Sequence, residues 1–361
     1  MAVLQEYKCP CCDGAIEFDS GTQKMKCPYC GTEFDVGTLE GYAENLKGDG
    51  EDSINWEQNS DNQWNEGEQE GLLTYVCNTC GGEIIGDFTT AATSCPYCGN
   101  PVVMTGKLSG ALKPDYVIPF KIDKNGAKEA LKQHYKGKVL LPKVFKDENK
   151  IEEIKGIYVP FWLFDADTDA HIRYKGTKVR SWSDSDYNYT ETRFYSITRG
   201  GNISFSNLPV DGSVKMQNEL MESIEPYRFS EAVSFQSAYL AGYFADRYDV
   251  DAKDCIETAN ARIKNSTSDA FRNTVTGYST VVAESANIKV KNGRTSYALL
   301  PVWILNTEWN GQKFRFAVNG QTGKVAGDLP MDKGAFWRWF AGLTVGVCAA
   351  VTGLMYLSWI M

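Results

Sequence analysis

The sequence predicts a multidomain α+β fold with two small cysteine-rich β ribbons, an α+β domain of two related lobes, and one C-terminal helix able to cross a membrane. Three observations lead to this prediction: four Cys-x-x-Cys pairs near the start, a repeated Pro-x-Trp segment, and a final stretch without charged side chains. With 361 residues, 43% of them hydrophobic, the chain is long enough for more than one domain.

The expected domain boundaries follow changes in composition along the chain. We expect ribbons at 1–36 and 72–106, an acidic disordered linker at 37–71, the α+β domain at 107–332 and the membrane helix at 337–361. The linker contains ten acidic residues and one lysine, so it carries the entire net charge of −9. Such a polar segment buries too little apolar surface to fold alone.

Two tryptophans, Trp56 and Trp64, are apolar exceptions within this linker. They are either incidental hydrophobes, a short binding motif, or side chains that dock back on the folded domain. The sequence leaves these three interpretations open.

The cysteine pairs form one unit, Cys-x2-Cys-x14-Cys-x2-Cys, that occurs twice. Four thiolates at this spacing suit one tetrahedral zinc ion, so we expect two structural Zn²⁺ ions. The predicted ligands are Cys9, Cys12, Cys27 and Cys30 for the first ion, and Cys77, Cys80, Cys95 and Cys98 for the second. Cys11 competes with Cys9 in the first ribbon and is otherwise a spare thiol.

Cysteine usage also bears on the cellular compartment. The N-terminal residues lack a secretory signal, and thiols with zinc-type spacing are typical of a reducing cytosol. A disulfide framework is the less favoured alternative.

The α+β domain shows helix and strand periodicity in turn. In the first ribbon we expect a hairpin with strands at 15–18 and 24–26. In the α+β domain we expect helices at 126–136, 237–248 and 252–263, the last with an extension to about 272. We also expect a strand at 157–172, a hairpin at 182–208, and strands over 278–326 with turns at 292–293, 310–311 and 319–320.

The segments 158–164 and 299–305 match each other as YVPFWLF and LLPVWIL. Proline at a strand start, followed by an apolar run, is typical of a buried strand. We therefore expect two related lobes, each built on one of these strands.

No local pattern in the sequence indicates catalysis. Asp165, Asp167, Asp169 and His171 would share one face of a strand and could hold a hard cation, but a solvated strand face is the better interpretation. A phosphate-binding glycine loop, an HExxH motif and a nucleophile elbow are all missing from the sequence. We therefore expect the protein not to be an enzyme.

The last 23 residues, 339–361, carry no charged side chain. At about 1.5 Å per residue this helix spans a hydrocarbon layer of about 30 Å. Lys324, Lys333 and Arg338 precede it, so the positive-inside rule predicts a tail-anchored, single-pass protein with its N-terminal part in the cytoplasm. Gly342 and Gly346 form a GxxxG pair that could support a homodimer.

The distribution of charge makes nucleic acid possible as a partner but does not favour it. The second ribbon has no lysine or arginine over 72–104, whereas phosphate contacts supply most non-specific affinity for nucleic acids. Residues 107–155 hold twelve lysines against seven acids. That stretch is interpreted first as a solvated face, then as a surface for anionic lipid, and last as a surface for nucleic acid.

A resemblance to a known family rests on the CPYCG knuckles, the GIYVPFWLFDA stretch at 156–166, the stretch at 224–250 and the C-terminal apolar segment. The sequence resembles a family of bacterial single-pass membrane proteins with two transcription-factor-B-type zinc ribbons. The resemblance covers most of the chain. It implies metal binding and a membrane anchor, and it implies no reaction.

The leading functional hypothesis is a cytosol-facing adaptor or scaffold that binds protein partners through its zinc ribbons. A membrane-associated nucleic-acid-binding protein is the first alternative. A redox or metal sensor, with Cys11 as its reactive thiol, is the second.

Overall fold

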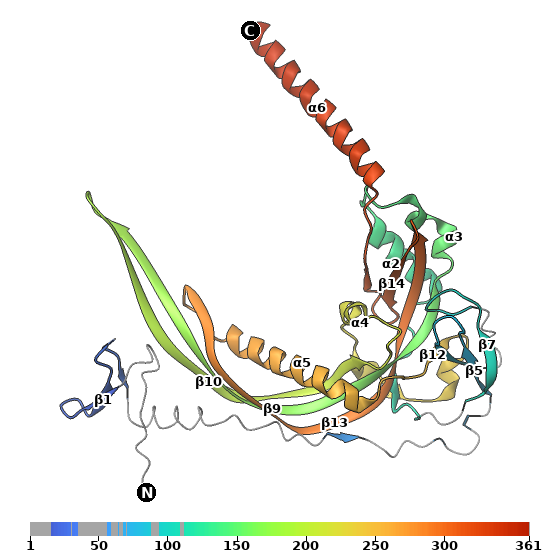
Figure 1. Ribbon diagram of the computed structural model, residues 1–361, viewed down its shortest axis with the longest axis horizontal. Helices are drawn as coiled ribbons and strands as arrows, with labels where there is room; N and C mark the ends of the chain where they lie inside the picture. Colours follow the sequence, from blue (N-terminus) through green and yellow to red (C-terminus); the bar gives the residue numbers. More distant parts are fainter. Residues whose placement is uncertain are drawn as a thin grey trace. The chain divides into compact units, whose positions relative to one another are not determined.

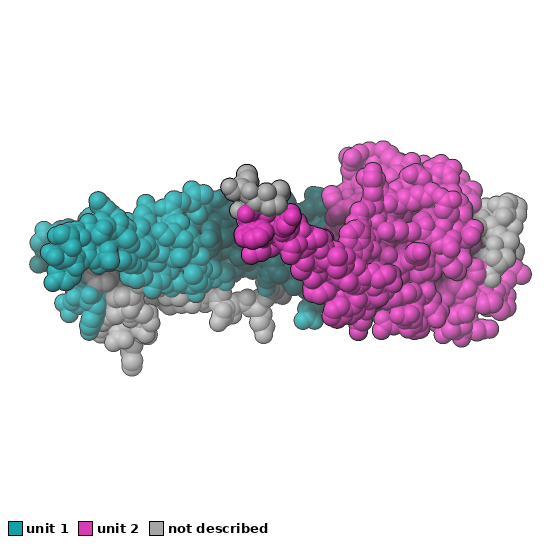
Figure 2. Space-filling model, turned by 90° about the horizontal axis from the view of Figure 1, so that it is seen from above, with its two compact units in different colours: residues 1–58, 164–208, 256–295 teal, residues 59–163, 209–255, 296–361 magenta. Residues whose placement is uncertain are grey.

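The computed structural model describes most of the chain, and Figure 1 shows its elements. The described residues are 16–29, 31–34, 56–58, 64, 68–69, 71–87, 94–108 and 112–360. Cys9, Cys11, Cys12 and Cys30 lie outside them, as does most of the predicted linker. The chain divides into two compact units that interleave along the sequence, coloured separately in Figure 2: residues 1–58, 164–208 and 256–295 form unit 1, and residues 59–163, 209–255 and 296–361 form unit 2.

Three long strands contribute to both units. They are β9 (Lys155–Ser183), β10 (Asn188–Asp211) and β13 (Thr280–Trp309). From Asp165 to Thr177, β9 alternates between buried and less buried residues. This period of two is that of a strand with one buried face.

Unit 1 buries that face of β9 against helix α5 (Ala252–Asn273). Ile172 and Tyr174 of β9 share a core cluster with Phe271 of α5. Trp56 belongs to a second cluster in this unit and meets the ring of Phe164 edge-on, with centroids 5.1 Å apart. Of the three interpretations of Trp56, docking on the folded chain is therefore confirmed.

Short strands of unit 1 come from the N-terminal part of the chain. Strand β1 (Glu17–Asp19) pairs antiparallel with β2 (Lys24–Lys26), which pairs with β3 (Glu33–Phe34). The predicted hairpin of the first ribbon is thus confirmed. Strand β4 (Glu57–Gln58) pairs in parallel with β13.

Unit 2 is built on a sheet in which the ribbon strands continue the strands of the α+β domain. The strand order is β11-β8-β13-β9-β12-β6-β5-β7, with β14 on β13 and β15 on β14. The shorter strands are β5 (Leu72–Val76), β6 (Glu83–Asp87), β7 (Val103–Lys107), β8 (Tyr116–Val117), β11 (Val233–Ser234), β12 (Phe244–Asp246), β14 (Gln312–Asn319) and β15 (Val325–Gly327).

Helix α2 (Lys124–Tyr135) packs on the sheet of unit 2 through one apolar face. Asp123 caps its first turn by accepting a hydrogen bond from Gly126 N at 2.8 Å. Leu131 and Tyr135 share a core cluster with Phe316 of β14. The short helices of this unit are η1 (Lys143–Lys146), α3 (Glu148–Ile151), α4 (Asn218–Ile224), η2 (Phe229–Glu231) and η3 (Ser237–Leu240).

The Pro-x-Trp residues of both segments, 160–162 and 301–303, lie in unit 2, on the adjacent strands β9 and β13. Residues 156–164 and 297–305 are almost entirely buried, as the apolar runs predict. The repeat thus corresponds to neighbouring strands of one sheet, which differs from the expectation of one lobe for each strand.

Two further expectations are wrong. The segment 237–248 is a 3-10 turn followed by β12, because residues 244–245 pair with β9 and 245–246 with β6. The expected turn at Asn292 is part of the continuous strand β13, where Asn292 takes a φ of 54° without ending the strand. The predicted helices at 126–136 and 252–272 are confirmed.

Helix α6 (Lys333–Ile360) confirms the predicted C-terminal helix. Its first turn is capped by Asp332, whose carboxylate accepts hydrogen bonds from Gly334 N and Ala335 N. Within Lys333–Tyr356, an 18-residue stretch has a mean hydropathy of 1.6, and none of that stretch is buried inside the protein. By length and composition α6 can therefore cross a membrane.

Candidate metal centre

Four cysteine sulfurs converge in the second ribbon. The Sγ atoms of Cys77, Cys80, Cys95 and Cys98 all lie within 4.8 Å of one another. Cys77 and Cys98 are 3.5 Å apart, and Cys80 and Cys95 are 3.6 Å apart. Ligands about 2.3 Å from a tetrahedral zinc ion are separated by roughly 3.8 Å, so the set fits such an ion. Among the residues the structure describes, this is the group suited to a metal ion.

The ribbon positions these sulfurs on two tight turns of the same kind. In the first turn Cys77 N donates to Gly82 O and Gly81 N donates to Cys77 O. In the second turn Cys95 N donates to Asn100 O and Gly99 N donates to Cys95 O, which repeats the pattern.

Both turns require glycine at the same place. Gly81 and Gly99 have φ values of 69° and 77°, in the left-handed region where a side chain is strained. The sequence motif Cys-x-x-Cys-Gly therefore encodes the turn as well as the ligands.

The knuckle at Cys27 has the same hydrogen bonds. Cys27 N donates to Thr32 O at 2.9 Å, and Gly31 N donates to Cys27 O at 2.8 Å. Gly31 has a φ of 72°, and Cys27 is buried. The other three predicted ligands of this ribbon fall outside the described residues, so the first ion stays a prediction.

Backbone amides around the cluster favour the thiolate form of Cys77. Burial raises the pKa of Cys77, but hydrogen bonds from the N–H groups of Cys80 and Thr79, together with those to the side chains of Cys98 and Cys80, outweigh this effect and lower the pKa to about 6. Burial raises the pKa of Cys80 and that of Cys95. A bound cation displaces the protons from such thiols, which couples metal affinity to pH.

Three cationic side chains balance the negative charge of the cluster. Arg315, Lys155 and Lys215 each interact electrostatically with at least one of the four cysteines. Lys155 Nζ donates to Ser94 O, beside Cys95, at 3.0 Å. Four thiolates around a divalent ion carry a net charge of −2, and nearby cations reduce the cost of burying it.

Arg315 on β14 fixes the second knuckle to the sheet. Its Nη2 donates to Tyr97 O at 2.7 Å and its Nη1 donates to Lys215 O at 2.6 Å. Asn306 of β13 accepts from Arg315 Nε at 3.2 Å and donates to Pro96 O at 2.7 Å. The knuckle is thus held by strands that lie more than 200 residues further along the chain.

The ribbon also shares the core of unit 2. Cys77, Cys95, Ile84 and Tyr97 belong to the same buried cluster as Phe161 of β9. Residues 84–85 of β6 pair with β12, so the ribbon sheet continues the main sheet. A metal ion bound at this site would therefore stabilise the sheet of unit 2 as well as the ribbon.

A pair of buried carboxylates near Tyr97 had no signal in the sequence. Burial raises the pKa of Asp211 to about 8 and that of Asp246 to about 7. Ser213 Oγ donates to Asp246 Oδ2 at 2.6 Å, whereas Asp211 Oδ2 and Asp246 Oδ1 lack a partner in the described part of the chain. Only the tertiary pairing of β12 brings these distant residues together.

The acidic face of β9 lies in unit 1, and none of its residues belongs to the four-cysteine group. Asp167 accepts from Ser204 Oγ and Asn292 Nδ2, and Asp169 accepts from Lys291 Nζ. These carboxylates are bonded to neighbouring strands, which is consistent with the preferred interpretation of a solvated face.

Comparison with known proteins places the chain in a family. No family model matches it, and no solved structure is significantly similar to it. One curated relative, named "Uncharacterized protein YdjG", comes from Bacillus subtilis (strain 168). It is 35% identical over 349 residues, which cover 97% of both chains. Identity of this level over nearly the whole length shows that the chain belongs to the same family as YdjG.

Proposed function

We propose that this protein is a zinc-stabilised, membrane-anchored adaptor whose folded part faces the cytoplasm. The geometry of the four cysteines supports a structural metal. Four sulfur ligands complete a tetrahedral shell and leave no position for substrate or water, whereas catalytic zinc sites keep one position open. The proposal therefore assigns the ion a role in folding and assigns the protein no reaction.

The observation that carries the adaptor role is an exposed aromatic surface on the hairpin of β9 and β10 in unit 1. Trp182, Tyr187, Tyr189 and Phe194 are 46%, 68%, 40% and 56% exposed. The rings of Trp182 and Tyr189 stack with centroids 5.5 Å apart. Exposed aromatic rings gathered in this way are typical of protein-binding sites.

Cations complete this surface, which we name the hairpin patch: Lys175, Arg180, Trp182, Tyr187, Tyr189 and Phe194. Arg180 lies over the ring of Trp182 at 5.5 Å, and Lys175 lies over that of Phe194 at 5.0 Å. Tryptophan, tyrosine and arginine are the residues that dominate binding energy at protein interfaces. We therefore place the partner on the hairpin patch, since the second ribbon is largely occupied by contacts with its own sheet.

The metal content of the full-length chain tests the zinc part of the proposal. The protein is purified in detergent without added metal and analysed by inductively coupled plasma mass spectrometry. Two zinc ions per chain are expected, because the Cys27 knuckle repeats the hydrogen bonds of the two knuckles in the four-cysteine site. One ion would restrict the proposal to the second ribbon, and none would overturn it.

A photo-crosslinking amino acid tests the adaptor part. We place p-benzoylphenylalanine at Tyr187 and, as a control, at Val282, which is also in unit 1 and 63% exposed. Irradiation of cells should give a discrete protein adduct from position 187 only. The adduct should disappear when Trp182→Ala and Tyr189→Ala are added. Identical adducts from both positions, or none, would contradict the proposal.

A further inference from the structure

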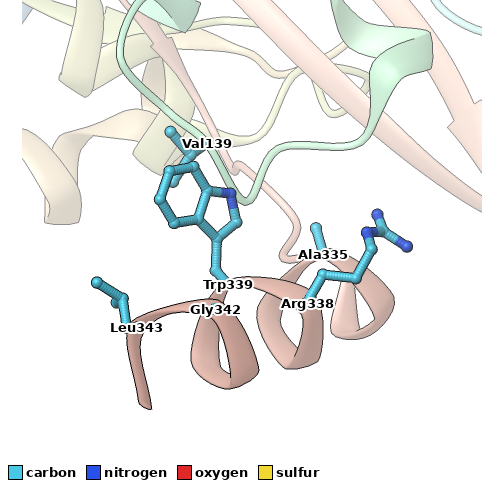
Figure 3. Close-up of a pocket in the computed structure, with 6 residues that line it drawn as sticks. All are labelled: Val139, Ala335, Arg338, Trp339, Gly342 and Leu343. Carbon is cyan, nitrogen blue, oxygen red and sulfur yellow. The ribbon is translucent and has the colours of Figure 1, made fainter. Parts of the chain in front are cut away.

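A groove lies beside the first turns of α6 in unit 2. It has a volume of about 420 Å³ and is lined by Val139, Ala335, Arg338, Trp339, Gly342 and Leu343. Figure 3 shows the ring of Trp339 rising from α6 next to Val139, with Arg338 on the other side of Ala335. Val139, Trp339 and Leu343 are 53%, 49% and 62% exposed, so apolar surface in this groove is open to the surroundings.

The small residues of α6 shape the groove. Ala335, Gly342 and the neighbouring positions 338 and 339 recur at intervals of three and four residues, which places them on one face of the helix. Apart from its chain neighbours and the backbone of its own helix, no atom lies within 4 Å of the position that a Cβ would take at Gly342. The groove therefore offers an open apolar floor at the point where the chain enters the proposed membrane span.

The loop that carries Val139 is positively charged and adjoins the start of α6. Asp332 N donates to Leu140 O at 2.9 Å, which fixes this loop at the helix N-terminus. The loop carries exposed lysines at positions 136 and 138, and η1, which follows it, carries exposed lysines at positions 143 and 146; we call these four the loop lysines. In the described part of the chain none of these four forms an ion pair.

The lysines of helices α2 and α3 are paired with acids. Lys128 lies 2.6 Å from Glu152, and Lys132 lies 3.0 Å from Glu148. Lys124 and Lys150 likewise contact glutamates. The four loop lysines thus differ from these paired lysines, and Arg338, whose side chain is 73% exposed and whose guanidinium lies 3.9 Å from Asp332, adds a cation to the groove lining.

We propose that this groove binds an anionic glycerophospholipid, with an acyl chain along Gly342 and Leu343 and the phosphate between Arg338 and the loop lysines. The inference rests on the proposed membrane anchoring by α6. An apolar floor with a cationic rim at a membrane surface matches an amphiphilic anion, and basic residues next to a membrane helix attract anionic headgroups. A soluble anion would use the rim and leave the floor unfilled.

The test uses the full-length chain reconstituted in nanodiscs of phosphatidylcholine with increasing brominated phosphatidylglycerol. Bromine quenches nearby tryptophan fluorescence, and the difference between the wild type and Trp339→Phe isolates the signal of Trp339. We expect half-maximal quenching of this signal at a low fraction of phosphatidylglycerol. Substitution of lysines 136, 138, 143 and 146 by Gln should raise that fraction about tenfold or more.

The matched control replaces lysines 124, 128, 132 and 150 by Gln, which removes the same charge from paired positions. Equal loss in both variants would overturn the site, since the effect would then be one of net charge. Brominated phosphatidylcholine that quenches as well as phosphatidylglycerol would also overturn it.

Other occupants of the groove give different results. Displacement of the lipid signal by inorganic phosphate alone would indicate a free anion and refute the lipid. Gly342→Leu should abolish the selective quenching of Trp339 and leave the oligomeric state unchanged. A change from dimer to monomer in that variant would instead assign the groove to a second copy. Failure of the wild type to enter phosphatidylcholine nanodiscs would refute membrane anchoring, which is a separate outcome.

Discussion

Arg315 provides the sharpest test of how the metal site is connected to the sheet. Its guanidinium donates to Tyr97 O, Lys215 O and Asn306 Oδ1. Arg315→Met keeps an unbranched apolar stem and leaves these three acceptors without their donor. An unsatisfied buried acceptor costs about 1–3 kcal/mol, and part of this site is reached by solvent. We therefore expect the free energy of unfolding to fall by about 3–5 kcal/mol.

The same substitution removes a positive charge that interacts with Cys80, Cys95 and Cys98. Loss of a residue that supports metal ligands typically lowers metal affinity by about 10–100-fold. Arg315→Lys separates the two effects, because lysine restores the charge without the planar set of donors. We expect Arg315→Lys to recover most of the zinc affinity and little of the stability.

Both quantities are measurable on the full-length protein in detergent. Zinc affinity follows from competition with a chromophoric chelator, and stability follows from urea unfolding at saturating zinc. Arg193→Met is the control, since Arg193 is exposed and pairs with the nearby Glu191. The electrostatic argument is refuted if the zinc affinity of Arg315→Met stays within twofold of that of the wild type. The hydrogen-bond argument is refuted if the free energy of unfolding of Arg315→Met equals that of the control.

Three further predictions concern the same region. Cys95→Ser should remove one metal ion per chain and lower the urea midpoint of unit 2, because Cys95 lies in the core of that unit. Cys27→Ser should leave the urea midpoint of unit 2 unchanged. Metal analysis and tryptophan fluorescence during urea unfolding distinguish the two variants. Asp246 has a pKa raised by burial to about 7, so the native state keeps a proton that the unfolded state releases. Stability should therefore fall by up to about 4 kcal/mol as the pH rises from about 4 to about 7, and Asp246→Asn should flatten this dependence in urea unfolding at pH 5 and 8. Gly99→Ala forces a side chain into a φ of 77° and should cost about 1–2 kcal/mol in the same assay, with Gly346→Ala in open space as the unaffected control.

Local patterns in the sequence predicted the elements whose structure depends on nearby residues. The Cys-x-x-Cys-Gly turns at Cys77 and Cys95 bring four sulfurs together as their spacing predicts, because ligands and turn lie within six residues. Helix α2 follows from a capping Asp123 and an apolar face. Helix α6 follows from an uninterrupted run of uncharged residues. Each of these features is decided over a few turns of chain.

The sequence could not predict which segments pair over long distances. Residues 237–248 have a helical appearance, yet β12 forms there because its backbone completes the sheet between β9 and β6. The two Pro-x-Trp strands look like the cores of two lobes, yet they lie side by side in one sheet. In both cases hydrogen bonds between distant strands decide the structure, and local propensity does not report them.

The sequence by itself determined the four cysteines that converge in the second ribbon, the turns that position them, and a C-terminal helix long enough to cross a membrane. The tertiary structure alone decided that this ribbon is part of a larger sheet, that Arg315 and Asn306 hold its second knuckle, and that Asp211 and Asp246 are buried near it. The physical reason is range: a metal turn is closed by residues within reach of one another along the chain, whereas burial and charge compensation depend on residues that only folding brings together.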